Sequence, residues 1–183
     1  MRKLTEEKLR SILCHKCTLK TVRNRCEECA LIRDVDPDLV VSIYIIESFF
    51  RPLYLRFCEY CLVLFAAMYC LVFKHPIRNY TIGCCQVGLS TILSYYGIQT
   101  YQHALTVMIS NSKDMLRILS VISKRKSIDI LLFRLAPIIQ RANRIYPNKL
   151  ESRLNYIGEQ FNGRFAYGML LSWVYLQVKT TTR

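Results

Sequence analysis

The stretch Leu39-Val-Val-Ser-Ile-Tyr-Ile-Ile-Glu47-Ser-Phe-Phe-Arg51-Pro52 closes an apolar run with a single carboxylate. Asp36 and Pro37 come just before it, and this pair is typical of a helix N-cap followed by the first helical position. Apolar residues recur at helical spacing on the face that carries Glu47. Because proline disfavours helix in the residue before it, we expect the helix to end one or two residues before Pro52.

Glu47 is expected in the last turn of this helix, among aromatic and branched apolar residues. Desolvation and the negative end of the helix dipole both disfavour a charged carboxylate, so we expect the pKa of Glu47 to be raised. A carboxylic acid that stays protonated near neutral pH suits the role of general acid. The alternative is a glutamate that simply reaches solvent at a helix end.

The composition is that of a folded, strongly basic chain. Its 183 residues are 52% hydrophobic, which suits one domain with a small appendage and excludes a disordered sequence. The 26 basic and 13 acidic residues give a net charge of +13. This charge implies an anionic partner: nucleic acid, an acidic lipid surface or a bacterial cell-wall polymer.

No signal peptide is visible near the start of the sequence, because residues 1–10 are polar and charged. The most membrane-like run, Tyr60–Phe73, has 14 residues, fewer than the roughly 20 needed to span a bilayer. We therefore expect a soluble protein that is synthesised in the cytoplasm, with no transmembrane segment, and a core helix at Tyr60–Phe73. The sequence does not indicate the oligomeric state.

Two C-x-x-C pairs near the N-terminus form the most specific local pattern, and the chain has nine cysteines in all. The four thiolates of two such pairs complete a tetrahedral zinc site without an open position, so this zinc is expected to be structural. The predicted ligands are Cys14, Cys17, Cys26 and Cys29. We predict a small zinc knuckle with a helix over residues 1–33, followed by the main domain over residues 34–183.

The remaining sequence is mainly helical in pattern. Asn79–Gly88 alternates and is interrupted by glycines, which predicts a hairpin. The periodicity predicts helices over Leu53–Phe73, Leu89–Tyr96, Tyr101–Ser110, Lys113–Ser123, Ser127–Tyr146 (interrupted or restarted at Pro137), Lys149–Gln160 and Arg164–Lys179, with Lys124–Lys126 as a solvated link. The expected fold class is α+β, mainly α.

Three motifs then occur in a familiar order. Glu47-Ser-Phe-Phe-Arg51-Pro52 resembles the Glu-Ser-x-x-x-Pro signature of lytic transglycosylases and goose-type lysozymes. Thr81-Ile-Gly83-Cys-Cys-Gln86 is similar to the Gly-x-x-Gln segment of those enzymes. Ile157-Gly-Glu-Gln-Phe-Asn162-Gly163-Arg-Phe-Ala-Tyr167-Gly168 resembles their Tyr-Asn-Gly…Tyr motif. The resemblance covers most of the chain after Asp36.

The resemblance implies a lysozyme-like fold, in which a cleft lies between a helical body and a small hairpin. It implies that Glu47 is the general acid/base and that Gln86 and the backbone around Gly83 hold a sugar's N-acetyl group or ring hydroxyls. Asn162 and Tyr167 would line the cleft wall next to Glu47. The implied substrate is the glycan strand of peptidoglycan.

The number of carboxylates bears on the type of reaction. A glycoside hydrolase usually adds a second carboxylate about 5 to 9 Å from the acid, but the predicted hairpin contains no Asp or Glu. Glu59 is close in sequence but on a different helix, where Arg51 or Arg56 can pair with it. A single carboxylate fits lytic transglycosylation. Hydrolysis is the alternative reaction, and in a hydrolase Thr81 would orient the attacking water.

Two functions therefore remain. The first is cleavage of peptidoglycan glycan strands by an enzyme that a secretion system, a holin or lysis delivers to the wall. The alternative is a binding protein without catalytic activity. Its zinc knuckle and basic surface would bind nucleic acid or a protein partner, and its lysozyme-like body would be inert. Lys20, Arg23 and Arg25 between the cysteine pairs suit a basic finger or a solvated loop.

Overall fold

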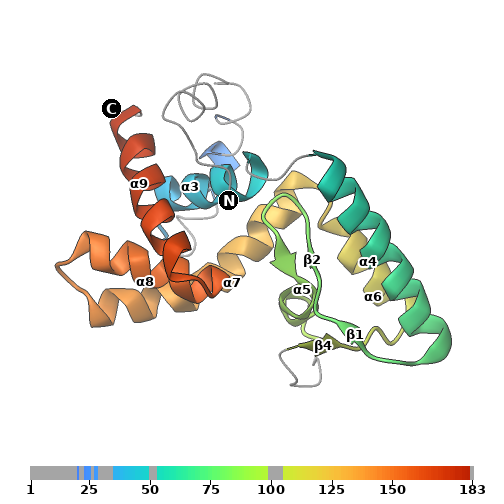
Figure 1. Cartoon of the computed structure of the whole chain (residues 1–183). Helices are drawn as coiled ribbons and strands as arrows, with labels where there is room; N and C mark the ends of the chain where they lie inside the picture. The colour runs from blue at the N-terminus through green and yellow to red at the C-terminus, as the bar shows by residue number, and fades with distance from the viewer. Residues whose placement is uncertain are drawn as a thin grey trace. The chain divides into compact units, whose positions relative to one another are not determined.

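The computed structural model describes Lys20 and residues 23–25, 27–28, 35–49, 53–98 and 105–181 (Figure 1). Within these residues the chain is mainly helical, with two small antiparallel sheets of two strands each. The expected class, α+β with mainly α, is confirmed at this level. The predicted zinc knuckle lies outside the described residues.

The chain divides into two compact units. Unit 1 combines Met1–Phe50 with Leu132–Arg183, and unit 2 is Arg51–Leu131. The boundary between Leu131 and Leu132 falls within helix α7, Lys124–Ile145. The predicted division between residues 33 and 34 lies outside the described residues and stays a prediction.

Helix α3 of unit 1 begins where the sequence indicated. Unit 1 also contains the second part of α7, α8 (Leu150–Asn162) and α9 (Phe165–Thr181). Helix α3 is Pro37–Phe49, and the Asp38 amide donates a hydrogen bond of 2.9 Å to the Asp36 carboxylate, which confirms the predicted N-cap. The Tyr175 hydroxyl of α9 donates to the same carboxylate at 2.6 Å. The capping residue therefore also fixes α9 against the start of α3.

Two glycines let α8 and α9 approach closely (Figure 1). A Cβ atom on Gly158 would lie 2.5 Å from the Cα atom of Gly168, and one on Gly168 would collide with the Asn155 carbonyl oxygen. Helix α8 ends at Gly163, whose φ of 75° is left-handed and therefore suited to glycine. The glycines of the third motif thus have a structural reason of their own.

Unit 2 consists of short strands between helices. Its elements are α4 (Leu53–Phe73), β1 (Ile77–Arg78), β2 (Thr81–Ile82), β3 (Val87–Gly88), α5 (Leu89–Tyr95), β4 (Thr106–Val107), α6 (Ser112–Ser120) and the start of α7. Strands β2 and β3 form an antiparallel hairpin in which Thr81 pairs with Gly88. The hairpin predicted over Asn79–Gly88 and the bounds predicted for α4 are confirmed.

Several predicted bounds are wrong. Residues 106 and 107, expected in a helix, form β4, which pairs with β1 in antiparallel register. Helix α7 starts at Lys124 rather than Ser127, so Lys124–Lys126 belong to its first turn, and it continues through Pro137. These errors arise because strand pairing over a long loop and tertiary packing are invisible to local periodicity.

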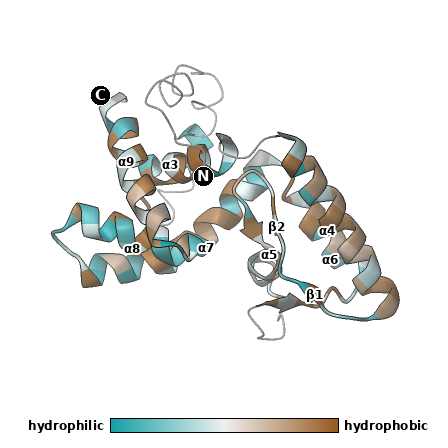
Figure 2. Ribbon diagram, in the orientation of Figure 1, coloured by the Kyte–Doolittle hydropathy of each residue, from teal (hydrophilic) through white to brown (hydrophobic). Residues whose placement is uncertain are grey.

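Helix α4 is mostly apolar (Figure 2), but it is not the buried core helix that we expected. Val63, Ala67 and Cys70 are buried, but most of the other apolar side chains along the helix are exposed. Tyr54–Phe73 is long and apolar enough to cross a membrane by length and composition, and only 17% of its apolar window is buried. It is the one such helix among the described residues. An apolar run alone does not indicate which face is covered.

Candidate active site

Glu47 is buried at the end of α3. Its exposed fraction is 6%, and the preceding residues of the helix, Ile43–Ile46, are buried as well. The alternative in which this glutamate reaches solvent is therefore wrong. A carboxylate is rarely buried without a partner.

The partner charge near Glu47 belongs to Arg134 on α7, also in unit 1. Burial lowers the pKa of the Arg134 guanidinium, whereas the charge of Glu47 and the Tyr167 side chain raise it. Arg134 also donates a hydrogen bond of 2.6 Å to the Phe161 carbonyl, and its guanidinium carbon lies 4.6 Å from the Phe161 ring centroid. A nearby guanidinium favours the charged form of a carboxylate, an effect that opposes desolvation.

The two candidate residues of the third motif differ in exposure: Tyr167 is buried and Asn162 is exposed. Tyr167 is 2% exposed, and its ring centroid lies 5.8 Å from that of Phe161. Glu47 and Tyr167 both act on the charge of Arg134. The predicted position of Tyr167 beside Glu47 in a cleft wall stays a prediction. Asn162, the last residue of α8, is exposed.

The hairpin turn of unit 2 has an unusual backbone at both ends. Gly83 has a φ of 87°, and a Cβ atom there would lie 2.8 Å from the Ser127 Oγ atom and 2.9 Å from the Val121 carbonyl oxygen. Gln86, a non-glycine residue, has a φ of 49°. A left-handed conformation at a non-glycine residue is costly and is found where surrounding contacts fix it.

Hydrogen bonds hold the Gln86 side chain, which is 5% exposed. Thr81 Oγ1 donates to Gln86 Oε1 at 2.7 Å, and Gln86 Nε2 donates to the Gly83 carbonyl oxygen at 3.3 Å. Nε2 also donates to the Glu59 carboxylate of α4 at 3.3 Å. The sequence thus identified three residues, Thr81, Gly83 and Gln86, that the structure brings together in one turn.

Glu59 supplies a carboxylate beside the hairpin that the hairpin sequence itself lacks. The sequence offered Arg51 or Arg56 as a partner of Glu59, and this pairing stays a prediction. The hydrogen bond from Gln86 ties Glu59 to the turn. The hairpin itself contains no Asp or Glu, as the sequence showed, and Glu59 of α4 adds a carboxylate next to it. Periodicity placed Glu59 on α4 but did not indicate which side of the helix faces the turn.

Two adjacent cysteines lie at the centre of the same turn. The Cys84 and Cys85 Sγ atoms are 3.8 Å apart, and the Cys85 amide donates to the Ser127 hydroxyl at 3.1 Å. Hydrogen bonds from Cys85 and from Ser127, helped by the charge of Arg56, outweigh burial and lower the pKa of the Cys84 thiol from 9.0 to about 7. This thiol therefore ionises more readily than an ordinary cysteine.

The predicted zinc ligands, Cys14, Cys17, Cys26 and Cys29, all lie outside the described residues. Among the residues that the structure describes, no group of three or more His, Cys, Asp or Glu side chains could hold a metal ion. The cysteines at positions 58, 61, 70, 84 and 85 form no disulfide bonds, and the last three are buried. The zinc site stays a prediction.

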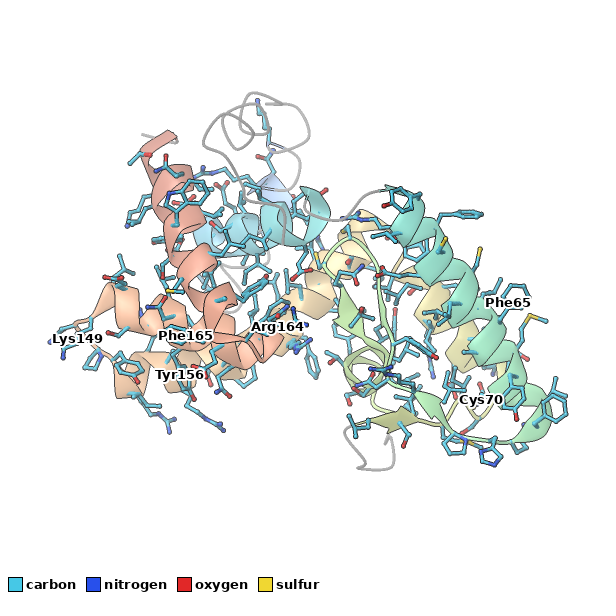
Figure 3. The ribbon with its side chains drawn as sticks, viewed as in Figure 1. Phe65, Cys70, Lys149, Tyr156, Arg164 and Phe165 are labelled. Carbon is cyan, nitrogen blue, oxygen red and sulfur yellow. The ribbon has the colours of Figure 1, made fainter. Side chains whose placement is uncertain are left out.

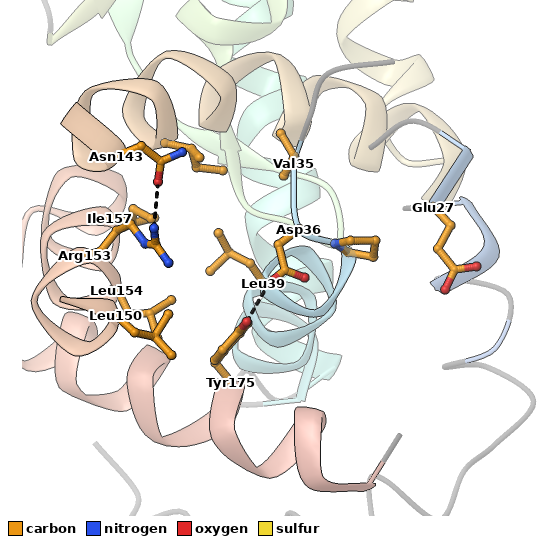
Figure 4. A pocket seen from close by; sticks show the side chains of 12 residues that line it. Glu27, Val35, Asp36, Leu39, Asn143, Leu150, Arg153, Leu154, Ile157 and Tyr175 are labelled. Carbon is orange, nitrogen blue, oxygen red and sulfur yellow. Dashed lines mark hydrogen bonds between the residues drawn. The ribbon is translucent and has the colours of Figure 1, made fainter. Parts of the chain in front are cut away.

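Unit 1 also contains a pocket of about 770 Å³ that the sequence did not indicate (Figure 4). Apolar side chains such as Leu39 and Leu154 line it, together with the hydrogen-bonded pairs Tyr175–Asp36 and Arg153–Asn143. Burial and the Asp36 carboxylate raise the pKa of Tyr175. Neither Glu47 nor any predicted sugar-binding residue is among the described residues that line this pocket.

Comparison with known proteins identified no relative. No family model, no curated protein and no solved structure matches the chain.

Proposed function

We propose that this protein cleaves the glycan strands of peptidoglycan by lytic transglycosylation, with Glu47 as its general acid/base. The observation that carries the proposal is the burial of the Glu47 carboxylate in the last turn of α3, close to Arg134 and Tyr167. A buried carboxyl among apolar groups can hold the proton that the leaving oxygen of a glycosidic bond requires. The order of the three motifs supports the same assignment.

The reaction needs one proton donor and no water. The Glu47 carboxyl gives its proton to the glycosidic oxygen as the bond between that oxygen and the anomeric carbon breaks. The resulting carboxylate then takes a proton from the 6-hydroxyl of the same sugar, whose oxygen forms the new bond to the anomeric carbon. The products are a 1,6-anhydro end and a free 4-hydroxyl, and Glu47 is protonated again. Arg134 stabilises the carboxylate between the two steps.

The motif resemblance assigns sugar binding to Thr81, Gly83 and Gln86 within unit 2 and to Asn162 within unit 1. Tyr167 is buried, so its role in this proposal is to act on the charge of Arg134 rather than to contact the sugar. The Gln86 amide is held by Thr81 and Glu59, so its orientation is fixed before a ligand binds. A fixed amide suits recognition of an N-acetyl group, because the side chain loses little conformational entropy on binding. Asn162 is exposed and therefore accessible to a sugar chain.

The experiment measures release of muropeptides from purified cell walls by the natural chain and by Glu47→Gln. Loss of a general acid typically costs about 10²- to 10⁴-fold in rate, and we expect a loss in that range. Glu151→Gln is the matched control, since Glu151 is an exposed carboxylate on α8 of the same unit. Equal release by the natural chain and Glu47→Gln would refute the assignment.

Hydrolysis is a second candidate reaction, because the Glu59 carboxylate lies at the Gln86 turn. A hydrolase needs a second carboxylate to activate water, and its products carry reducing ends instead of 1,6-anhydro ends. Under the proposed transglycosylase reaction, Glu59 has no proton to transfer. Glu59→Gln should therefore leave the type of product end unchanged.

The alternative function is binding by an inert body. Two observations favour it: the Gln86 amide already has hydrogen bonds within the protein, and the Glu47 carboxylate already has the Arg134 guanidinium as a partner. Groups that already have protein partners are less available to a substrate. The partner would be nucleic acid or a protein, with the net charge of +13 providing attraction. Binding to nucleic acid that weakens steeply with salt, together with unchanged cell walls, would favour this alternative.

The zinc knuckle is proposed for either function. Cys14, Cys17, Cys26 and Cys29 would bind one structural zinc ion through four thiolates. Metal analysis should give one equivalent per chain, and Cys17→Ser should remove it. Zinc retained after replacement of Cys17 and, separately, of Cys26 would refute this site.

A further inference from the structure

One side of α4 carries large apolar side chains that are exposed in the part of the chain that the structure describes. We call this set the outer face: it consists of Tyr54, Leu55, Phe57, Leu62, Phe65, Met68, Tyr69, Val72 and Phe73. Phe65 and Val72 are each 70% exposed, and Figure 3 shows Phe65 pointing away from the rest of unit 2. The outer face runs the length of a helix of 21 residues, about 31 Å at the usual rise. An apolar surface of this extent usually marks an interaction site.

The opposite side of α4 is fixed against the strands of its own unit. Val63, Ala67 and Cys70 are buried there, and α4 packs against β1 and β2. The Ile109 amide donates to the Cys70 Sγ atom at 3.2 Å. Since this packing determines which side of α4 faces the strands, the outer face cannot turn inward without breaking it.

Charge around α4 favours an anionic partner. Within the helix the charged residues are Arg56 and Glu59, both near its start, and none occurs from Tyr60 to Phe73. Unit 2 as a whole contains nine basic and three acidic residues, and two of the acidic ones are engaged with Gln86 and with Arg117. Lys74 and Arg78, both exposed, follow the helix directly.

We propose that the outer face of α4 inserts into the surface of an anionic lipid bilayer, with the helix axis parallel to the membrane plane. Aromatic side chains at both ends of the helix suit the interface between headgroups and acyl chains, and basic side chains beside them attract anionic lipids. The helix does not cross the bilayer in this arrangement. Strands β1 and β2 pack against α4, so a helix that crossed the bilayer would carry the strands and the hairpin turn into hydrocarbon. The unpaired backbone groups at the edges of these short strands would lose their hydration there.

The test uses the full chain with two kinds of vesicle: phosphatidylcholine alone, and phosphatidylcholine with phosphatidylglycerol in equal parts. We expect the chain to float with the anionic vesicles and more weakly with the neutral ones. The variant Phe57→Gln/Phe65→Gln/Val72→Gln should lower the partition coefficient by about 100-fold, because three exposed apolar side chains no longer enter the bilayer. Glutamine preserves the charge and is a good helix former, so folding should be retained.

The matched control is Leu105→Gln/Leu116→Gln/Phe165→Gln, which replaces three equally exposed apolar residues outside α4. This control should bind vesicles as the natural chain does. A second readout is Phe65→Trp in a Trp173→Phe background, since Trp173 is the one tryptophan of the sequence. Its emission should shift to the blue with anionic vesicles and be quenched by lipids brominated on their acyl chains.

Three results would overturn the proposal. The first is a chain that does not float with anionic vesicles, and the second is equal binding by the outer-face variant and the control variant. The third is a natural chain that forms dimers without lipid while the outer-face variant is monomeric and binds vesicles undiminished, which would assign the face to a second copy of the chain. None of these measurements depends on cell-wall cleavage.

Discussion

Replacement of Gly83 by alanine should destabilise unit 2 through two separate effects. Gly83 has a φ of 87°, a conformation that costs an L-residue about 1–2 kcal/mol. The new Cβ atom would also lie 2.8 Å from Ser127 Oγ, 2.9 Å from Val121 Cγ1 and 2.9 Å from the Val121 carbonyl oxygen. Overpacking of this kind typically costs about 1–3 kcal/mol, so the expected total is about 2–5 kcal/mol.

Gly97→Ala separates the two effects. Gly97 has a φ of 73° in the same unit, but nothing lies within 4 Å of the position that its Cβ would take. Both substitutions gain the same small amount from a less flexible unfolded chain, so this gain cancels in the comparison. The expected difference between the two variants is therefore the overpacking cost alone, about 1–3 kcal/mol.

The assay must report on unit 2. The single tryptophan, Trp173, lies in unit 1, so tryptophan fluorescence would report on the other unit. Native-state hydrogen exchange of peptides from α5, measured by mass spectrometry, gives the opening free energy of the relevant unit. If Gly83→Ala and Gly97→Ala differ by less than about 0.5 kcal/mol, the close contact of the turn with Ser127 and Val121 does not exist as described.

Two further predictions concern the groups around the candidate site. The thiolate absorbance at about 240 nm should titrate with a midpoint around pH 7 instead of 9.0, because the hydrogen bonds of the folded turn lower the pKa of the Cys84 thiol. Cys84→Ser should remove this step, and a midpoint near 9.0 would contradict the geometry of the cysteine pair. Arg134→Met should lower the unfolding free energy of unit 1 by about 2–4 kcal/mol, measured by urea denaturation followed at Trp173, because the Phe161 carbonyl and the Glu47 carboxylate lose their cationic partner. Arg141→Met, at an exposed position of the same helix, should change it by less than about 0.5 kcal/mol, and equal effects of the two substitutions would show that Arg134 has no such role.

Local chemistry made the start of α3 and the turns predictable. Asp36 and Pro37 mark a cap and a first helical turn by their own side-chain properties, and the structure has the helix from Pro37. Gly83, Gly97 and Gly163 all take left-handed φ values at the turns and helix ends where the sequence placed breaks. Each of these features depends on a few neighbouring residues, so the sequence was sufficient.

The partners of the candidate residues were not predictable in the same way. Arg134 acts on Glu47, and Glu59 bonds to Gln86, through contacts between elements that are distant along the chain. The pairing of β1 with β4 likewise closes a long loop that carries no local signal. The uncovered face of α4 was missed for a related reason: an apolar run looks the same whether protein or another partner covers it.

The most direct test of the central assignment, Glu47 as the proton donor of a transglycosylase, is the amount of 1,6-anhydro product formed. Purified peptidoglycan is digested with the natural chain and with Glu47→Gln, and the new glycan ends are identified by mass spectrometry. We predict 1,6-anhydro ends from the natural chain and a yield from Glu47→Gln that is lower by at least about 100-fold. Equal yields from the two proteins, or reducing ends alone, would contradict it.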